Sequence, residues 1–158
     1  MIKVLFVCLG NICRSPTADG VFGDLVTREQ YTSIEVDSCG TAGYHIGGEP
    51  DQRSQQTALK NGINISHLRA RQLTHSDFAE FDYILAMDKD NLRNMLSVCP
   101  PNLQSKVHLF MSFADNYPDV IEVPDPYYGG PNGFDEVFDY VVDASQGLLT
   151  TIKKEHKI

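Results

Sequence analysis

Residues 2–16 read IKVLFVCLGNICRSP, and this stretch carries the strongest signal for the class of fold. Ile2 to Cys8 is a nearly continuous apolar run, which is typical of a strand buried on both faces of a parallel sheet. The run stops at the Gly-Asn pair at 10–11. Ser15 and Pro16 then indicate a helix start, with Ser15 at the N-cap and Pro16 at the first helical position. The stretch therefore predicts a strand, a short loop and a helix in succession.

The rest of the chain continues this alternation of strand and helix. Further strands are predicted at residues 34–38, 82–87 and 106–110, and further helices at residues 51–60, 88–98 and 134–152. The stretch VPDPYYGGP at 123–131 is too rich in proline and glycine for regular structure. The pattern predicts one α/β domain over residues 1–158, with a parallel sheet covered by helices on both faces. Because ligands bind beyond the carboxyl ends of the strands in such folds, Cys8 lies where a ligand would bind.

Composition limits the classes of function. The chain has 158 residues, 42% hydrophobic and 22% charged, which indicates one globular domain that needs no disulfide or metal to form a core. The net charge of −8 argues against nucleic acid or an anionic membrane as partner, so an anionic substrate needs a local positive field. Neither a signal peptide nor a membrane span is recognisable, so we expect a cytoplasmic protein whose four cysteines are reduced.

Residues 8–15, CLGNICRS, supply the parts of an anion-binding site. A short loop between strand and helix points its backbone N–H groups inward, and the helix N-terminus adds partial positive charge. Arg14 contributes a planar fork of donors that matches two phosphate oxygens. This field favours the thiolate of Cys8, which can attack phosphorus. Ser15 can donate its hydroxyl to that sulfur, and the side-chain amide of Asn11 can hold the loop together.

Other motifs fit this loop poorly. It lacks the lysine of a nucleotide-binding loop, the Gly-x-Gly-x-x-Gly of a dinucleotide site and the Cys-x-x-Cys pair of a metal site. A cysteine at a strand end can also be a small buried apolar residue without chemistry. The strand before the loop, the helix after it and the Asp-Pro pair at 125–126 favour the catalytic interpretation.

Residues 8–16, taken together with the DPYYG stretch at 125–129, resemble the low-molecular-weight protein tyrosine phosphatase family. The resemblance covers nearly the whole chain in length, element order and motif placement. It implies a flavodoxin-like fold with a four-stranded parallel sheet. It also implies hydrolysis of phosphotyrosine and small aryl phosphates through a phosphocysteine on Cys8, without metal or cofactor. The expected partners are phosphotyrosine-containing proteins, the product is inorganic phosphate, and the molecule is a monomer or a weak homodimer.

The resemblance also assigns roles to single residues. Asp125 is the expected general acid, which protonates the leaving phenolate and then, once ionised, activates water. Cys13 is a neighbouring thiol that can trap an oxidised Cys8 as a disulfide. Ser38 and His67 match positions that support the loop, and Asp88 matches a structural position. The substrate-binding residues expected from the family are Leu9, Gly10, Asn11, Ile12, Cys13, Ser15, Tyr44 and Tyr128.

The sequence argues against three other functions. An arsenate reductase on this fold needs shuttle cysteines near residues 80–90, and this segment has none. Arginine phosphatases of the family resemble Cys-x-Gly-Asn-Thr-Cys-Arg and Asp-Pro-Phe, where this chain has Ile12 and Tyr127. A phosphate-binding module without catalysis would need neither the nucleophile nor the acid. Asp19-Gly20 replaces the more usual Glu-Ala of the family, which is expected to make the first helix less rigid.

Overall fold

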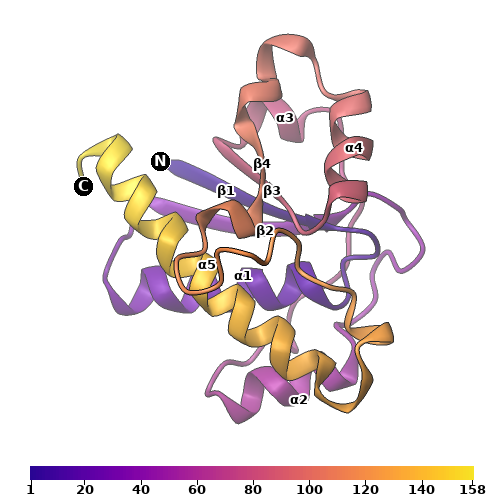
Figure 1. Cartoon of the computed structure of the whole chain (residues 1–158). Helices are drawn as coiled ribbons and strands as arrows, with labels where there is room; N and C mark the ends of the chain where they lie inside the picture. Colours follow the sequence, from indigo (N-terminus) through magenta and orange to yellow (C-terminus); the bar gives the residue numbers. More distant parts are fainter.

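The computed structural model describes all residues from 1 to 158. Its sheet has four strands in the order β2-β1-β3-β4, and every pairing is parallel (Figure 1). The strands are β1 (Ile2–Cys8), β2 (Ile34–Gly40), β3 (Tyr83–Ala86) and β4 (Val107–Leu109). This order is that of a flavodoxin-like sheet, so the predicted fold class is confirmed.

Helices cover both faces of the sheet (Figure 1). The larger apolar core lies under α1 (Arg14–Arg28), α2 (Gln52–Lys60) and α5 (Gly133–His156), and the smaller one under α3 (Asp77–Glu80) and α4 (Lys89–Val98). In β1 the side chain of Phe6 enters the larger core, while those of Leu5 and Val7 enter the smaller one. Burial on both faces explains the continuous apolar run of this strand. None of the helices combines the length and apolar character that a membrane span needs.

Several element boundaries differ from the prediction. The first helix begins at Arg14 with Cys13 in the cap position, so the assignment of Ser15 as N-cap is wrong. The Ser15 hydroxyl contacts the Cys8 sulfur instead, and no side chain caps this helix. The 123–131 stretch contains short 3₁₀ turns at Pro126–Tyr128 and Gly130–Asn132, because a proline at the start of such a turn has no N–H to satisfy. The four-residue helix α3 was missed because it is too short to show a helical period.

The first helix runs unbroken through Gly20 and Gly23. At position 20 the absence of a side chain has a packing reason. A Cβ there would overlap the side chain of Ile65, so glycine lets the segment after α2 pack directly against α1. The loss of rigidity expected from the Asp19-Gly20 pair does not break the helix.

The strand order reverses between β1 and β3, which makes their carboxyl ends the topological switch point of the sheet. Cys8 is the last residue of β1, and β3 ends two residues before Asp88. The fold thus brings the Cys8 loop and the start of α4 to the same edge of the sheet.

We predict that Gly147→Ala destabilises the protein. Gly147 lies in α5 against the turn at Phe110–Phe113, and a Cβ at this position would overlap the carbonyl oxygen of Phe113. Backbone atoms cannot move aside as a flexible side chain can, so the free energy of unfolding should fall by about 3 kcal/mol. Urea unfolding followed by circular dichroism measures the change.

Gly23→Ala is the matched control, because a Cβ at Gly23 meets no atom within 4 Å. Alanine is the better helix former, so this variant should be about 0.5–1 kcal/mol more stable than the wild type. Equal unfolding midpoints for Gly147→Ala and the wild type would contradict the close approach of α5 to Phe113.

Candidate active site

The sulfur of Cys8 lies 2.9 Å from the hydroxyl oxygen of Ser15, and both residues are buried. The side-chain amide of Asn11 donates to the same hydroxyl oxygen at 2.8 Å. The Ser15 hydroxyl has one proton, which it can direct either at Cys8 or at the carbonyl oxygen of Cys39, 3.3 Å away. The hydroxyl is therefore placed to donate its proton to the Cys8 sulfur.

The loop between β1 and α1 is held by its carbonyl groups. The Ile12 carbonyl accepts from the backbone N–H of Asp51 at 2.7 Å, and the carbonyls of residues 8 and 9 accept from those of residues 41 and 42. Asn11 takes a positive φ of 57°, which asparagine tolerates, and its side-chain oxygen accepts from the Arg71 backbone N–H at 3.0 Å. The backbone N–H groups of residues 9–13 make no hydrogen bond within the chain. Such a run of free N–H groups forms an anion-binding nest.

Arg14 is 5% exposed and is held from one side only. Its Nη1 donates to Asp88 at 2.6 Å and to the Val123 carbonyl at 3.0 Å, while Nε and Nη2 have no partner within the chain. Burial acts to lower the pKa of Arg14, but the Cys8 and Asp88 charges outweigh it, so the pKa is raised and the guanidinium stays charged. Asp88 in turn caps α4 by accepting from the Asn91 N–H. The free edge of the guanidinium is therefore available for an anion.

A cavity of about 250 Å³ lies over the loop and brings together most of the predicted site residues. Asn11 and Ser15 lie buried behind its wall. Two lining residues, His45 and Tyr127, were missed by sequence reasoning, although both are next to residues that it named. The lining consists of Cys8, Leu9, Gly10, Ile12, Cys13, Arg14, Tyr44, His45, Asp125, Tyr127 and Tyr128.

Asp125 is half-buried at the side of this cavity. One of its carboxylate oxygens accepts from the Tyr127 backbone N–H at 3.0 Å, and the intervening Pro126 is buried. The local turn therefore fixes the direction of the carboxyl group. Tyr44 and Tyr128 form exposed rims, with 77% and 89% of their surface accessible.

The residues expected to support the loop lie elsewhere. The Ser38 hydroxyl donates to Asp19 at 2.9 Å and makes no hydrogen bond with the loop. His67 is exposed and makes no hydrogen bond through its ring. Support of this kind comes from the Arg71 backbone N–H on Asn11, a contact between residues 60 positions apart that no local pattern reveals.

Cys13 is a buried thiol beside Cys8 in the cavity wall. Burial, together with the nearby Asp51 charge, raises the pKa of Cys13 to about 12. The thiol is therefore protonated at neutral pH and is a slow nucleophile. Its redox role stays a prediction.

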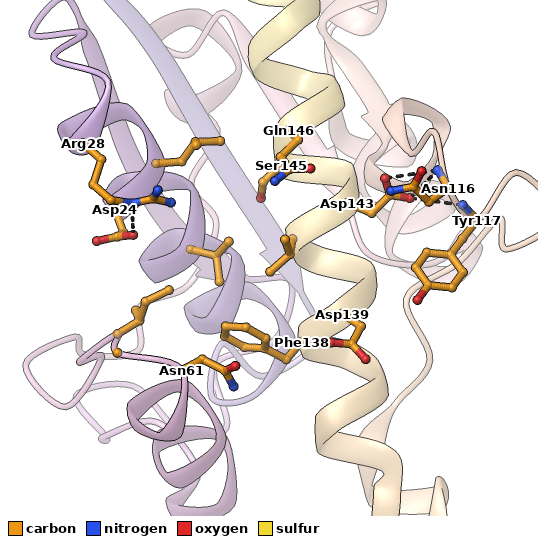
Figure 2. Close-up of a pocket in the computed structure, with 15 residues that line it drawn as sticks. Asp24, Arg28, Asn61, Asn116, Tyr117, Phe138, Asp139, Asp143, Ser145 and Gln146 are labelled. Atoms are coloured by element: carbon orange, nitrogen blue, oxygen red, sulfur yellow. Dashed lines mark hydrogen bonds and ion pairs between the residues drawn. The ribbon is translucent and has the colours of Figure 1, made fainter.

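The largest groove of the molecule, about 840 Å³, lies between α1 and α5, and no residue of the Cys8 loop lines it (Figure 2). Three of its four charged side chains are already paired, and the fourth, Asp139, is exposed. Asp24 bonds Arg28 at 2.7 Å, and the Asp143 carboxylate accepts from the backbone N–H groups of residues 115–117. This groove offers no activated nucleophile, so its size does not make it the reaction site.

Burial raises the pKa of Asp19 to about 6, against 3.8 for an exposed aspartate, and the Ser38 hydrogen bond offsets the shift only in part. The unfolded chain therefore loses this proton first, and the folded state loses relative stability as the pH rises from about 4 to about 6. We predict that Asp19→Asn, which keeps an acceptor for Ser38, gains stability over the wild type across this range. The gain should approach about 3 kcal/mol at pH 7 and be small at pH 4.

Urea unfolding at both pH values measures the difference. Asp139→Asn, which makes the same change at an exposed carboxylate of α5, is the matched control for the substitution itself. A pH-independent difference between Asp19→Asn and the wild type would refute the assignment.

Comparison with known proteins agrees with this geometry. The family model described as low molecular weight phosphotyrosine protein phosphatase matches residues 3–158. A protein of that name from Schizosaccharomyces pombe is 49% identical over 154 residues, covering 96% of this chain and 97% of the relative. The structure of a protein tyrosine phosphatase from Entamoeba histolytica superposes with a TM-score of 0.93 at 39% identity, covering 100% of both chains. A Drosophila arginine phosphatase superposes with a TM-score of 0.86 at 32% identity, covering 96% of this chain and 98% of that one. The chain belongs to the low molecular weight phosphotyrosine protein phosphatase family.

Proposed function

We propose that this chain is a protein tyrosine phosphatase that works through a phosphocysteine on Cys8. The observation that carries the proposal is the meeting of three features in one cavity. These are the Cys8 sulfur held by Ser15, the free N–H groups of residues 9–13 and the unpaired edge of Arg14. Together they bind a phosphate group and place a nucleophile beneath its phosphorus atom.

The first step transfers the phosphoryl group to the enzyme. The Cys8 thiolate attacks phosphorus, a P–S bond forms and the bond to the ester oxygen breaks. Asp125 gives its proton to the departing phenolate, which leaves as a neutral phenol. The N–H groups of the loop and Arg14 stabilise the charge that develops on the phosphoryl oxygens.

The second step returns the enzyme to its starting state. Asp125, now a carboxylate, accepts a proton from water as the water oxygen attacks phosphorus and the P–S bond breaks. Inorganic phosphate leaves and the Cys8 thiolate is restored. Arg14 and the loop supply positive charge throughout, so the chemistry is proposed to need no metal ion.

The walls of the cavity support an aryl ester as substrate. Cys8 is 3% exposed, so a substrate must reach down to it, and the exposed rings of Tyr44 and Tyr128 can pack on an aromatic leaving group. Phosphotyrosine-containing proteins are therefore the proposed substrates.

The nucleophile and the acid are tested with p-nitrophenyl phosphate in excess EDTA. We expect the wild type to be active and Cys8→Ser to be inactive, because a hydroxyl at this position is not ionised. Asp125→Ala should lower kcat by about 10²- to 10⁴-fold through loss of the general acid.

Cys99→Ser is the matched cysteine control, since Cys99 lies in the other core and should leave the rate unchanged. Loss of wild-type activity in EDTA, or retained activity of Cys8→Ser, would overturn the phosphocysteine mechanism.

The substrate class is tested by offering a phosphotyrosine peptide and the matching phosphoarginine peptide. Ile12 lines the cavity as an apolar wall, and a flat ring contacts such a wall better than a guanidinium group does. We expect kcat/KM to be about 10- to 200-fold higher for phosphotyrosine, the discrimination typical of an apolar pocket. Faster hydrolysis of phosphoarginine would move the chain to the other substrate class and leave the role of Cys8 intact.

A further inference from the structure

Arg53 lies where three parts of the chain meet. It is the second residue of α2, and its guanidinium pairs with the Asp51 carboxylate through two contacts, Nε to Oδ1 at 3.2 Å and Nη2 to Oδ2 at 3.0 Å. The same carboxylate accepts from the Arg53 backbone N–H at 2.8 Å and so caps the helix. The guanidinium is therefore held in one plane at the N-terminus of α2.

The guanidinium carbon also lies over two aromatic rings. It is 4.6 Å from the ring centre of Tyr127 and 4.6 Å from that of Phe134. Phe134 belongs to the first turn of α5, and Tyr127 follows the Asp125-Pro126 pair. Arg53 thus connects the start of α2 with the segment that leads into α5, and these two segments lie side by side (Figure 1).

This connection reaches both segments that carry reacting groups in the proposed mechanism, the Cys8 loop and the turn at Asp125. On one side the backbone N–H of Asp51 donates to the Ile12 carbonyl at 2.7 Å, which ties α2 to the Cys8 loop. On the other side the backbone N–H of Tyr127 donates to the Asp125 carboxylate at 3.0 Å. An unbroken set of contacts therefore runs from the nucleophile loop through Asp51 and Arg53 to the carboxyl group of Asp125.

The segment that carries Asp125 has need of such a support. Tyr127 is 56% exposed and Tyr128 is 89% exposed, so the solvent side of this segment makes few packing contacts besides the one with Arg53. An arginine fits this place better than a lysine because its flat guanidinium can stack on rings while its edge bonds a carboxylate.

We propose that Arg53 is a positioning residue for the reaction, which holds the Tyr127 ring and thereby keeps the Asp125 carboxyl group over the Cys8 cavity. The proposal rests on the role of Asp125 in the proposed function. Arg53 touches neither substrate nor nucleophile, so its effect should appear only in the step that uses the acid. Misplacing a catalytic group by about 1 Å can lower a rate by about 10²-fold.

The test compares Arg53→Met with the wild type on two substrates, phenyl phosphate and p-nitrophenyl phosphate. Phenolate is the poorer leaving group and needs the proton of the acid more. We expect kcat/KM to fall about 10-fold for phenyl phosphate, which is less than for complete loss of the acid because a loosened acid retains part of its effect. For p-nitrophenyl phosphate, whose leaving group needs the proton less, kcat/KM should fall no more than about 3-fold. Arg53→Lys keeps the charge and should recover part of the loss on phenyl phosphate.

Arg28→Met is the matched control. Arg28 is also an exposed arginine in an ion pair, with Asp24 at 2.7 Å, but it lies in α1 and makes no cation–π contact. This variant should have wild-type kinetics on both substrates. Equal losses on the two substrates for Arg53→Met would mean a general structural effect and would overturn the proposal.

A double variant separates this inference from the proposed function. If Arg53 acts through Asp125, then Arg53→Met should cost nothing further in the Asp125→Ala background. Multiplied losses in the double variant would refute the positioning role and leave the acid in place. If Asp125→Ala affects both substrates equally, Asp125 is not the general acid. The assignment of the acid and the positioning role of Arg53 then both fail.

Discussion

The backbone N–H groups of residues 9–13 have no partner within the chain, and the contacts that hold this loop leave them unpaired. Unpaired N–H groups in a folded protein are costly unless an anion or water satisfies them. The loop resists closing on itself because the carbonyls of residues 8 and 9 bond the segment after β2 and that of residue 12 bonds the start of α2. The site is therefore open to an anion before any ligand arrives, which lowers the reorganisation that binding requires.

The positive charge of the site is also local and differs in sign from the net charge of the chain. The chain as a whole carries a net charge of −8, and that field repels a phosphate ester. In the proposed function, Arg14 and the N–H groups of the loop overcome this repulsion at short range, where buried charges are weakly screened. Asp88 keeps Arg14 charged and oriented but bonds only one of its nitrogen atoms, so the arginine is held without being fully neutralised.

The start of α2 links the Cys8 loop with the segment that carries Asp125. Asp51 caps this helix, bonds the Cys8 loop through its backbone and binds Arg53 through its side chain. Burial alone would raise the pKa of Asp51, but hydrogen bonds from Arg53 bring it below its ordinary value, so the carboxylate stays ionised. The same charge contributes to the raised pKa of Cys13, which keeps that thiol protonated beside Cys8. The N-terminus of α2 thus bonds the Cys8 loop, contacts the Tyr127 ring through Arg53 and raises the pKa of Cys13.

Features that depend only on neighbouring residues could be predicted from the sequence. The apolar run of β1, the helix that ends at Asn61-Gly62 and the alternation of elements all follow from local periodicity and turn chemistry, so the fold class could be predicted. Cys8, Arg14 and Ser15 lie within eight residues of the sequence, so their grouping was visible in the motif. The tertiary structure alone decided which distant residues meet. Asp88 reaches Arg14 across 74 positions and Arg71 reaches Asn11 across 60, while Ser38 bonds Asp19 and His67 faces solvent. The physical reason is that a periodic pattern specifies which face of an element is buried, whereas contacts between elements depend on how they pack together.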